Sequence, residues 1–465
     1  MLRNLLLYAF IGITSLTCHS QSINDKILNA INHSDWFALD SIYDSAPKDS
    51  IHPFLEISSR CFIGHQLNRP DVSIPAFQEL FNTQSENLDL NNFITFAVMF
   101  GKDLNKVGEN EFAASMINQA IGQTQQYLDS ASVSNLSMMA NWYSALAPYN
   151  TYQIQFNEAD VATVPFEIIP MGPKEKGGVL MQLKESAING TPADMIFDTG
   201  CVSSIISPEM AEKYGLTPLE GSKVSVAGIG STNGYLAIAK ELKLGNITIK
   251  DVPFTVTSMS LAAINDEADQ YADALNIILG NDLMLQLKDI TIDFVSNNLT
   301  IPASATSNPV RTQAKPNICF ADTRNLLCKC EIHDTPLLML IDSGNASYGT
   351  LGEGFFDRNK PFVLANGTKD TVRQAGIGGI KINERYLLPN LKISLGGHTA
   401  EIPEIDIKTA PEPASEGEGV LGLRTLMLYP QIHLNFTDFT LTPTPAKKIT
   451  TPRINKNTNN ITSHS

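Results

Sequence analysis

Two stretches of the sequence repeat one pattern and decide the fold: MIFDTG at Met195–Gly200 and MLIDSG at Met339–Gly344. Each is an apolar run that ends in Asp, a hydroxyl residue and Gly, and each follows a Thr-Pro pair. The proline precedes the aspartate by the same spacing in both copies (198 − 192 = 342 − 336). An apolar strand that ends in this way carries one carboxylate out of a dry core, and the glycine lets the chain turn at once.

Further landmarks follow each copy in the same order. A Gly-Ile-Gly run stands at 228–230 and again at 376–378, and a Leu-Gly pair closes the apolar runs Ile277–Gly280 and Gly419–Gly422. The second landmark follows the first by 148 residues (376 − 228) and 142 residues (422 − 280), and the two aspartates are 144 apart (342 − 198). These near-equal offsets predict an internally duplicated domain with two lobes of one design.

The duplication gives the two aspartates a chemical meaning. A single Asp-Thr/Ser-Gly is most simply a turn in which the aspartate bonds to its own backbone. Pseudo-twofold packing of two copies, however, would bring Asp198 and Asp342 face to face. Two carboxylates a few Å apart cannot both ionise easily, so one keeps its proton. Such a pair can activate a water molecule and polarise a peptide carbonyl, which predicts peptide-bond hydrolysis without metal, cofactor or covalent intermediate.

The order of these motifs resembles the retropepsin-like aspartic peptidases, over residues 164–442. The resemblance implies a small closed β-barrel in each lobe and both lobes fused in one chain, as in pepsins, although the pepsin disulfides and flap tyrosine are not recognisable. It also implies catalytic roles for Asp198 and Asp342. The residues that would support the two catalytic loops are Thr199, Gly200, Ser343 and Gly344. The flap residues that would cover the substrate are Gly228, Ile229, Gly230, Gly376, Ile377 and Gly378.

Two positions depart from the family pattern. The residue after the catalytic glycine is usually Ala or Ser in the family, whereas this chain has Cys201 in the first lobe and Asn345 in the second. Cysteine is small enough to be tolerated there. Asparagine is polar and larger, so we expect the second lobe to have an altered cleft.

The pattern of apolar residues along the chain changes near residue 150. Between 21 and 150 apolar residues recur at helical spacing, which predicts about three helical hairpins. Their length suits tetratricopeptide repeats, but consensus positions are not apparent. Short Val-, Ile- and Thr-rich runs then predict strands, in lobes at 160–303 and 304–445, followed by a disordered polar tail at 446–465. The predicted fold class is therefore α+β and multidomain, with a helical-hairpin domain followed by a duplicated all-β retropepsin-like double barrel.

Residues 1–20 have the layout of a secretory signal, with a basic start, an apolar run at Leu5–Leu16 and small or polar residues after it. The run is short for a bilayer span, and an uncleaved anchor is the alternative. Ser15–Cys18 resembles a lipoprotein box that would lipidate the cysteine, and cleavage after Ser20 is the competing outcome. We expect an exported protein (periplasmic, cell-surface lipoprotein or secreted) without a later membrane span.

Composition excludes some partners. The chain has 33 Lys and Arg against 48 Asp and Glu, and this net charge of -15 argues against nucleic acid and anionic membranes. Its eight histidines form no metal-binding motif, so no metal is predicted. The cysteines beyond residue 20 are expected to be free or buried, with a disulfide from Cys319 to Cys328 or Cys330 as the alternative. In a strand those last two cysteines would share one face, with Lys329 opposite.

We therefore expect an aspartic endopeptidase that hydrolyses a peptide or protein substrate through Asp198 and Asp342. The helical domain would hold a protein partner, shield the cleft as a propeptide does, or recruit the substrate. The rival interpretation is a non-catalytic peptide- or protein-binding surface protein of the same fold. The presence of both carboxylates favours the enzyme, whereas Asn345 and the lack of a recognisable processing site favour the rival.

Overall fold

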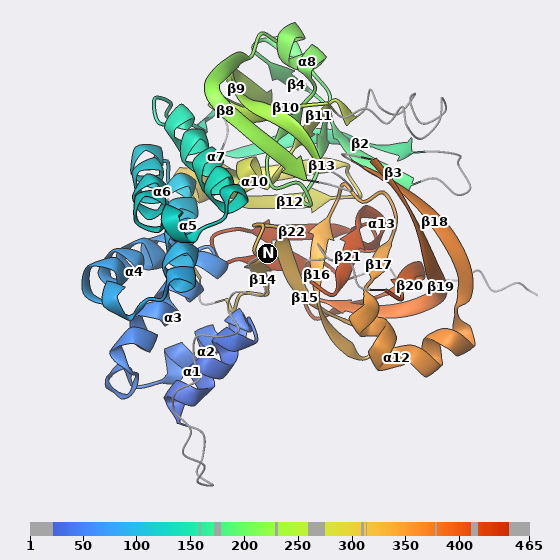
Figure 1. Cartoon of the computed structure of the whole chain (residues 1–465). Helices are drawn as coiled ribbons and strands as arrows, with labels where there is room; N and C mark the ends of the chain where they lie inside the picture. The colour runs from blue at the N-terminus through green and yellow to red at the C-terminus, as the bar shows by residue number, and fades with distance from the viewer. Residues whose placement is uncertain are drawn as a thin grey trace, which may run out of the picture.

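A computed structural model gives the architecture of the chain (Figure 1). It describes residues 22–157, 160–171, 178–227, 231–258, 275–307, 311–312, 314–376, 379–410 and 417–445. Helices fill the first third of the described chain and strands dominate the rest, which confirms the predicted fold class. The predicted signal peptide and polar tail lie outside the described residues.

The helical region consists of consecutive antiparallel hairpins followed by one further helix. Its helices are α1 (Ile23–Asn32), α2 (Trp36–Ser45), α3 (Pro53–Gln66), α4 (Pro70–Thr83), α5 (Leu90–Lys106), α6 (Asn110–Thr124) and α7 (Ser130–Leu146). Short 3-10 turns follow α2, α4 and α6 at Lys48–Ser50, Ser85–Asn87 and Gln125–Tyr127. Aspartates cap the N-termini of α2, α5 and α7, because Asp35, Asp89 and Asp129 each accept an amide N–H of the first turn.

Two of the hairpins repeat a pattern that the sequence reading missed. Small and apolar residues of α3 and α4 recur 37 residues later (101 − 64) in α5 and α6. The matched pairs are Gly64 and Gly101, Leu67 and Leu104, Ala76 and Ala113, and Leu80 and Ile117. A side chain at Gly64 would overlap Ser73, so the glycine lets α3 and α4 approach closely. The spacing of these positions is similar to that of the small and apolar residues in tetratricopeptide repeats.

The first lobe, residues 161–287, is a barrel. Its strands are β2 (Val161–Met171), β3 (Gly178–Leu183), β4 (Ser186–Ile188), β5 (Thr191–Pro192), β6 (Met195–Phe197), β7 (Ile205–Ile206), β8 (Thr217–Ala227), β9 (Ser231–Leu244), β10 (Ile247–Thr257) and β11 (Ile277–Leu279), and its helices are α8 (Pro208–Lys213) and α10 (Asn281–Leu287). The strand order is β3-β6-β11-β7-β10-β9, and β4, which continues β3, pairs with β9 and closes the barrel.

The second lobe, residues 318–426, has the same arrangement. Its elements are β14 (Ile318–Phe320), β15 (Leu326–Ile332), β16 (Thr335–Asp342), β17 (Gly349–Leu351), α12 (Glu353–Asn366), β18 (Thr368–Gly376), β19 (Gly379–Leu395), β20 (His398–Lys408), β21 (Gly419–Gly422) and α13 (Leu423–Leu426). The order β15-β16-β21-β17-β20-β19 matches the first lobe strand for strand, and a β15–β19 pairing closes this barrel. The two lobes thus share one topology.

A separate set of strands joins the lobes. These are β12 (Asp289–Asp293), β13 (Asn298–Pro302), β22 (Gln431–Asn435) and β23 (Thr440–Pro443), with the short helix α11 (Ala303–Ser307) after β13. β12 pairs with both β13 and β22, and β13 pairs with β2 of the first lobe. The predicted boundary at 303/304 therefore does not separate the sheets, because strands from both sides of it form one ladder. The apolar residues of β12 and β22 alternate with polar ones, but this alternation carries no information on which strand pairs with which.

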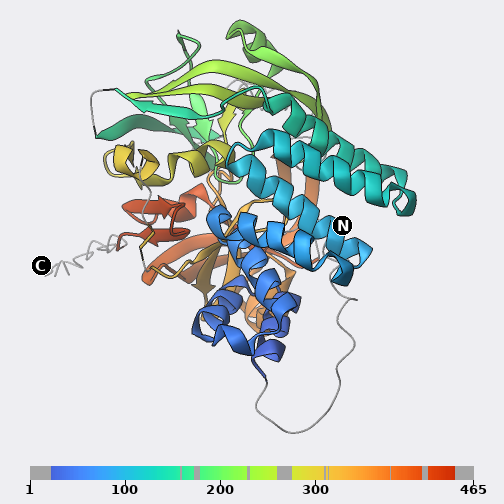
Figure 2. The ribbon, with the colours of Figure 1, turned by 90° about the vertical axis from the view of Figure 1, so that its left-hand side faces the viewer.

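The helical region packs against both lobes (Figures 1 and 2). Its apolar core includes Cys319, Ala321 and Leu327 of the second lobe, and α7 contacts β8 of the first. Polar contacts add to this junction: the Asp71 carboxylate pairs with Arg311, and the Asn68 amide donates to the Phe436 carbonyl at 2.8 Å. The helices and lobes are consequently packed as one body rather than joined by a free linker.

The cysteines agree with the expectation of free, mostly buried thiols. Cys61, Cys201, Cys319, Cys328 and Cys330 are all unpaired, and only Cys201 is partly exposed. On β15 the side chains of Cys328 and Cys330 are buried while Lys329 between them is exposed. The alternative disulfide from Cys319 is therefore not formed. In the described part of the chain, no helix is long and apolar enough to cross a membrane.

Candidate active site

The two Asp-Thr/Ser-Gly motifs occupy equivalent places in the two barrels. Asp198 directly follows β6, and Asp342 is the last residue of β16. β6 runs parallel to β11, and β16 runs parallel to β21, so each aspartate ends a buried strand beside a Leu-Gly element. The apolar residues before each aspartate face the core, which is why the chain can fix these strands and release the carboxylate at their ends.

Reciprocal hydrogen bonds tie together the two loops that carry Asp198 and Asp342. The Thr199 amide donates to Ser343 Oγ at 2.9 Å, and the Ser343 amide donates to Thr199 Oγ1 at 2.9 Å. Each hydroxyl also donates across the interface, Thr199 to the Ile341 carbonyl at 3.0 Å and Ser343 to the Phe197 carbonyl at 2.8 Å. Both side chains are fully buried. Thr199 and Ser343 therefore hold the loops in place and have no free hydroxyl for nucleophilic attack.

This clamp brings the two carboxyl groups into contact. Each glycine of the motifs lies against the opposite aspartate, because a Cβ on Gly200 would overlap the Asp342 carboxyl group and one on Gly344 would overlap that of Asp198. The Asp198 and Asp342 side chains are hydrogen-bonded to each other. The glycines are thus required for the close approach of the pair.

Backbone donors distinguish the two carboxyl groups. Asp198 Oδ1 accepts the Gly200 amide at 2.8 Å and, from the other lobe, the Gly344 amide at 3.1 Å. Asp342 Oδ1 accepts the Asn345 amide at 2.9 Å. Amide donors favour the ionised form of a carboxyl group. The negative charge is therefore better supported on Asp198.

The pKa values of the pair follow from this environment. Burial raises the pKa of Asp342 well above the ordinary value of 3.8, and the neighbouring Asp198 charge raises it further. Burial also raises the pKa of Asp198, but the amides of Gly200 and Gly344 and the bond from Asp342 oppose that rise. Burial and mutual repulsion therefore favour a pair that shares one proton, and the amide donors favour the negative charge on Asp198.

Residues after the first Leu-Gly pair support the catalytic loop, and the sequence reading missed them. The Asn281 amide donates to the Thr199 carbonyl at 2.8 Å. Asp282 Oδ1 accepts the backbone amide of Ser204 at 2.9 Å and its hydroxyl at 2.8 Å. Burial raises the pKa of Asp282, although these donors partly oppose it. Asn281 and Asp282 directly follow the Leu-Gly pair, which could have indicated their role. A polar pair at that position, however, also fits an exposed turn.

The two departures from the family pattern leave the dyad in place. The Asn345 side chain accepts the Ser347 amide at 3.1 Å and its hydroxyl at 2.8 Å, so it caps its own loop. Its backbone amide still reaches Asp342. The Cys201 thiol donates to the Ser203 carbonyl at 3.0 Å. In neither loop does the extra side chain contact a carboxylate through a hydrogen bond in the described residues.

The predicted flap residues fall almost entirely outside the described chain. Gly228, Ile229, Gly230, Ile377 and Gly378 are not described, whereas Gly376 ends β18. The strands on either side form antiparallel hairpins, with Ala227 opposite Ser231 and Gly376 opposite Gly379. Both Gly-Ile-Gly runs therefore connect the arms of a hairpin, and their role over the cleft stays a prediction.

No group of three or more His, Cys, Asp and Glu side chains among the described residues is placed to hold a metal ion. The predicted site residues that the structure does bring together are the two aspartates and the four loop residues beside them. Two carboxyl groups in contact can share one proton, so that one of them can donate a proton while the other accepts one.

Comparison with known proteins identifies the class of fold. Residues 185–283, which include the first catalytic loop and its Leu-Gly element, match the model of a family described as Aspartyl protease. Among solved structures, a retropepsin-like aspartic protease from Rickettsia conorii matches with 16% identity and a TM-score of 0.20, covering 33% of this chain and 96% of that one. A search of curated proteins finds no match. The family match thus covers much of the first lobe, and the second lobe repeats the strand order of the first.

Proposed function

We propose that this protein is an aspartic endopeptidase in which Asp198 and Asp342 activate a water molecule. One observation carries the proposal: the aspartate-bearing loops of two barrels are clamped together so that their carboxyl groups meet and Asp198 receives two amide donors. The same topology in both lobes supports an internal duplication as the origin of the pair. The match of residues 185–283 to the Aspartyl protease family is consistent with this chemistry.

The proposed reaction needs only these two groups and water. Ionised Asp198 takes a proton from water as the water oxygen bonds to the substrate carbonyl carbon, and Asp342 gives its proton to the carbonyl oxygen. The tetrahedral intermediate then loses its C–N bond as Asp198 passes its proton to the leaving nitrogen. Asp342 recovers a proton from the intermediate hydroxyl when the carbonyl reforms. The pair ends as it began, with one proton on Asp342.

We also propose that the helical region stays attached to the working protein and offers a surface to a protein partner or substrate. Its shared apolar core with Cys319, Ala321 and Leu327 supports attachment over release as a propeptide. The repeated small residues at Gly64 and Gly101 support a tetratricopeptide-like hairpin array. Cleavage between the helices and β2 should therefore lower the melting temperature of the lobes rather than activate them.

We further propose that the chain is exported. This rests on the basic start, the apolar run at Leu5–Leu16 and the small residues after it. Mass spectrometry of the N-terminal peptide would distinguish a lipidated Cys18 from cleavage after Ser20. An N-terminus that begins at Met1 would contradict both routes.

The activity test uses purified protein and a mixed peptide library from about pH 4 to 7.5. Wild type is compared with Asp198→Asn and Asp342→Asn, which preserve side-chain shape but remove the shared proton. The proposal predicts cleavage by wild type and about a hundredfold to ten-thousandfold less by either variant. A folded wild-type protein that cleaves nothing would favour the non-catalytic binding protein, and a fully active variant would refute the dyad. Inhibition by pepstatin would add support for the proposal.

A further inference from the structure

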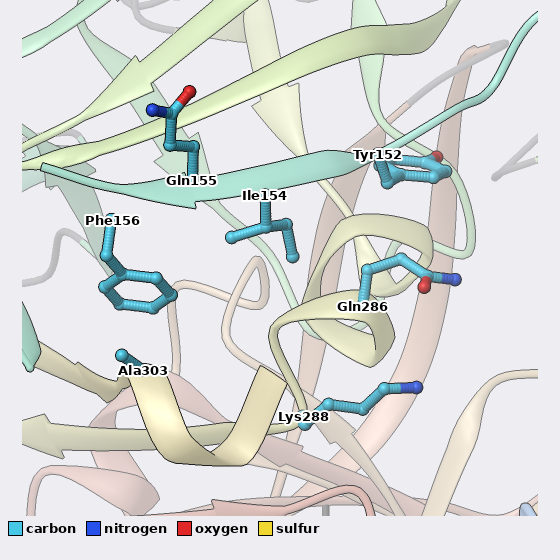
Figure 3. Close-up of a pocket in the computed structure, with 7 residues that line it drawn as sticks. All are labelled: Tyr152, Ile154, Gln155, Phe156, Gln286, Lys288 and Ala303. Carbon is cyan, nitrogen blue, oxygen red and sulfur yellow. The ribbon is translucent and has the colours of Figure 1, made fainter. Parts of the chain in front are cut away.

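A pocket whose lining does not include the carboxyl pair lies between the strand at residues 153–156 and the segments that carry Gln286, Lys288 and Ala303 (Figure 3). Its volume is about 470 Å³, within the range of cavities that hold small ligands. The pocket is formed by β1 (Gln153–Phe156), the end of α10 and the start of α11. Its lining residues are Tyr152, Ile154, Gln155, Phe156, Gln286, Lys288 and Ala303.

The pocket has an apolar side and a polar side. Ile154 and Phe156 point from one face of β1 toward Ala303, while Gln155 points away from them (Figure 3). This alternation is that of a strand, so one face of β1 makes the apolar wall. Gln286 and Lys288 extend together beneath the Tyr152 ring on the other side (Figure 3). A ligand that fits both sides must carry an apolar group and a polar end.

Most polar groups of the wall already have partners. The Tyr152 hydroxyl donates to Asp282 Oδ2 at 2.9 Å. The Gln286 amide donates to the Lys106 carbonyl at 3.2 Å. The Lys288 ammonium, in contrast, has no ion pair or hydrogen bond within the described ranges of the chain. Lys288 is therefore the wall residue that can recognise a charge.

The backbone at Lys288 is unusual for its residue type. Lys288 is the C-cap of α10 and has φ 65° and ψ −38°, a positive φ that glycine adopts most easily. Burial lowers the pKa of its ammonium, and the positive charge of Arg311 adds to this effect. An unpaired, half-buried cation on a strained backbone is costly for stability alone. A bound anion would offset that cost.

We propose that this pocket binds a small organic carboxylate with an apolar group, such as a fatty acid or the free C-terminus of a peptide. The carboxylate would pair with Lys288, and the apolar group would lie against Ile154, Phe156 and Ala303. Phosphate fits less well, because it favours several strong donors and Lys288 is the one unpaired cation of the wall among the described residues. The site does not involve the carboxyl pair, so it stands independently of the proposed peptidase activity.

The test is a binding titration of the purified full-length chain by isothermal titration calorimetry. The Asp198→Asn variant serves as host, so that turnover cannot consume a peptide-like probe. The probes are N-acetyl-leucine and hexanoate, which separate a peptide terminus from a fatty acid, together with N-acetyl-leucinamide and acetate. The amide lacks the charge, and acetate lacks the apolar group.

We expect saturable binding of at least one of the two apolar acids, and about tenfold weaker or no binding of the amide and of acetate. Lys288→Met should weaken binding of the acid about tenfold or more. Lys288→Gly should do the same while relieving the strained backbone, so a folding defect cannot explain the loss. Lys392→Met, at an exposed lysine of β19, is the matched control and should bind like the parent protein.

Three results would overturn the inference. These are no saturation by either acid up to about 10 mM, equal affinity for N-acetyl-leucine and its amide, and unchanged binding in both Lys288 variants. None of them bears on peptide cleavage. Conversely, a protein that binds the acid but cleaves no peptide would contradict the proposed activity and support the proposed binding site.

Discussion

The two loops that carry Asp198 and Asp342 have the same backbone arrangement but different electrostatics. Both aspartates end a strand that runs parallel to a Leu-Gly strand, and Thr199 and Ser343 exchange equivalent hydrogen bonds. Asp198 nevertheless receives amides from both lobes, whereas Asp342 Oδ1 receives that of Asn345. Two loops with the same backbone arrangement can therefore give their carboxyl groups different hydrogen-bond donors. Small differences in the loops decide which aspartate keeps the proton.

Among changes that keep both aspartates, the largest expected effect comes from closing the space between the loops. Gly200→Ala or Gly344→Ala would push a methyl group into the opposite aspartate, so we expect peptide cleavage to fall about a hundredfold or more. Gly122→Ala in α6 is the control, because a side chain there meets nothing within 4 Å. It should leave cleavage unchanged and stabilise the helix by up to about 1 kcal/mol. Full activity of the Gly200 and Gly344 variants would mean that the carboxyl groups are not in contact.

The clamp itself gives the next effect. Thr199→Ala leaves the Ser343 amide and the Ile341 carbonyl without their buried partner, at a cost of about 1 to 3 kcal/mol in the free energy of unfolding. We expect cleavage to fall about tenfold, because the two carboxyl groups lose their fixed separation. Thr199→Ser keeps the hydroxyl and makes the two loops alike, so it should retain most of the stability and most of the cleavage rate. Chemical denaturation and cleavage rates measure the two outcomes.

The unequal carboxyl groups predict unequal effects on stability. Folding raises the pKa of Asp342, so the stability gained from its bound proton is complete below the unfolded pKa and is lost as the pH rises toward the folded value. Asparagine has no such dependence. Asp342→Asn should therefore raise the melting temperature at neutral pH, by about 2 to 4 °C per kcal/mol gained, and should not raise it at about pH 3.

Asp198→Asn is the matched comparison for that measurement. The increase in melting temperature at neutral pH should be smaller for this variant, because the Gly200 and Gly344 amides already favour the ionised Asp198. Equal gains for the two variants would show that the loops do not distinguish the carboxyl groups.

The smallest effects are expected at the two positions that depart from the family pattern. Asn345→Ala removes the cap on Ser347 but keeps the backbone amide that donates to Asp342. Cys201→Ala removes one thiol contact with the Ser203 carbonyl. Either variant should change cleavage by less than about threefold and stability by about 1 kcal/mol or less. If Asn345→Ala alone greatly changed peptide cleavage, this residue would shape the second half of the cleft, as the sequence predicts.

Local patterns in the sequence predicted the repeated elements well. The apolar runs before Asp198 and Asp342 form strands, as predicted. Each Gly-Ile-Gly run joins the two arms of a hairpin. Contacts between distant segments were harder to predict. The pairing of β12 with β22 and the amide from Gly344 to Asp198 join residues more than a hundred positions apart. Spacing alone does not encode such partners.

Two further features escaped the sequence for other physical reasons. The helical repeat rests on small residues such as Gly64 and Ala76, whose importance depends on how closely two helices approach. Lys288 has a positive φ, which favours glycine, so a lysine at this position gave no signal of a pocket. Which aspartate holds the proton depends on amide directions, and these appear only once both lobes are folded.

The most direct test of the shared proton is carbon-13 NMR of the protein labelled at the aspartate side-chain carboxyl carbon. Asp198→Asn and Asp342→Asn assign the two signals. The account predicts a range of pH, above the ordinary aspartate pKa of 3.8, in which Asp342 is protonated and Asp198 ionised. Two carboxyl groups that both titrate near 3.8, each unaffected by loss of the other, would contradict it.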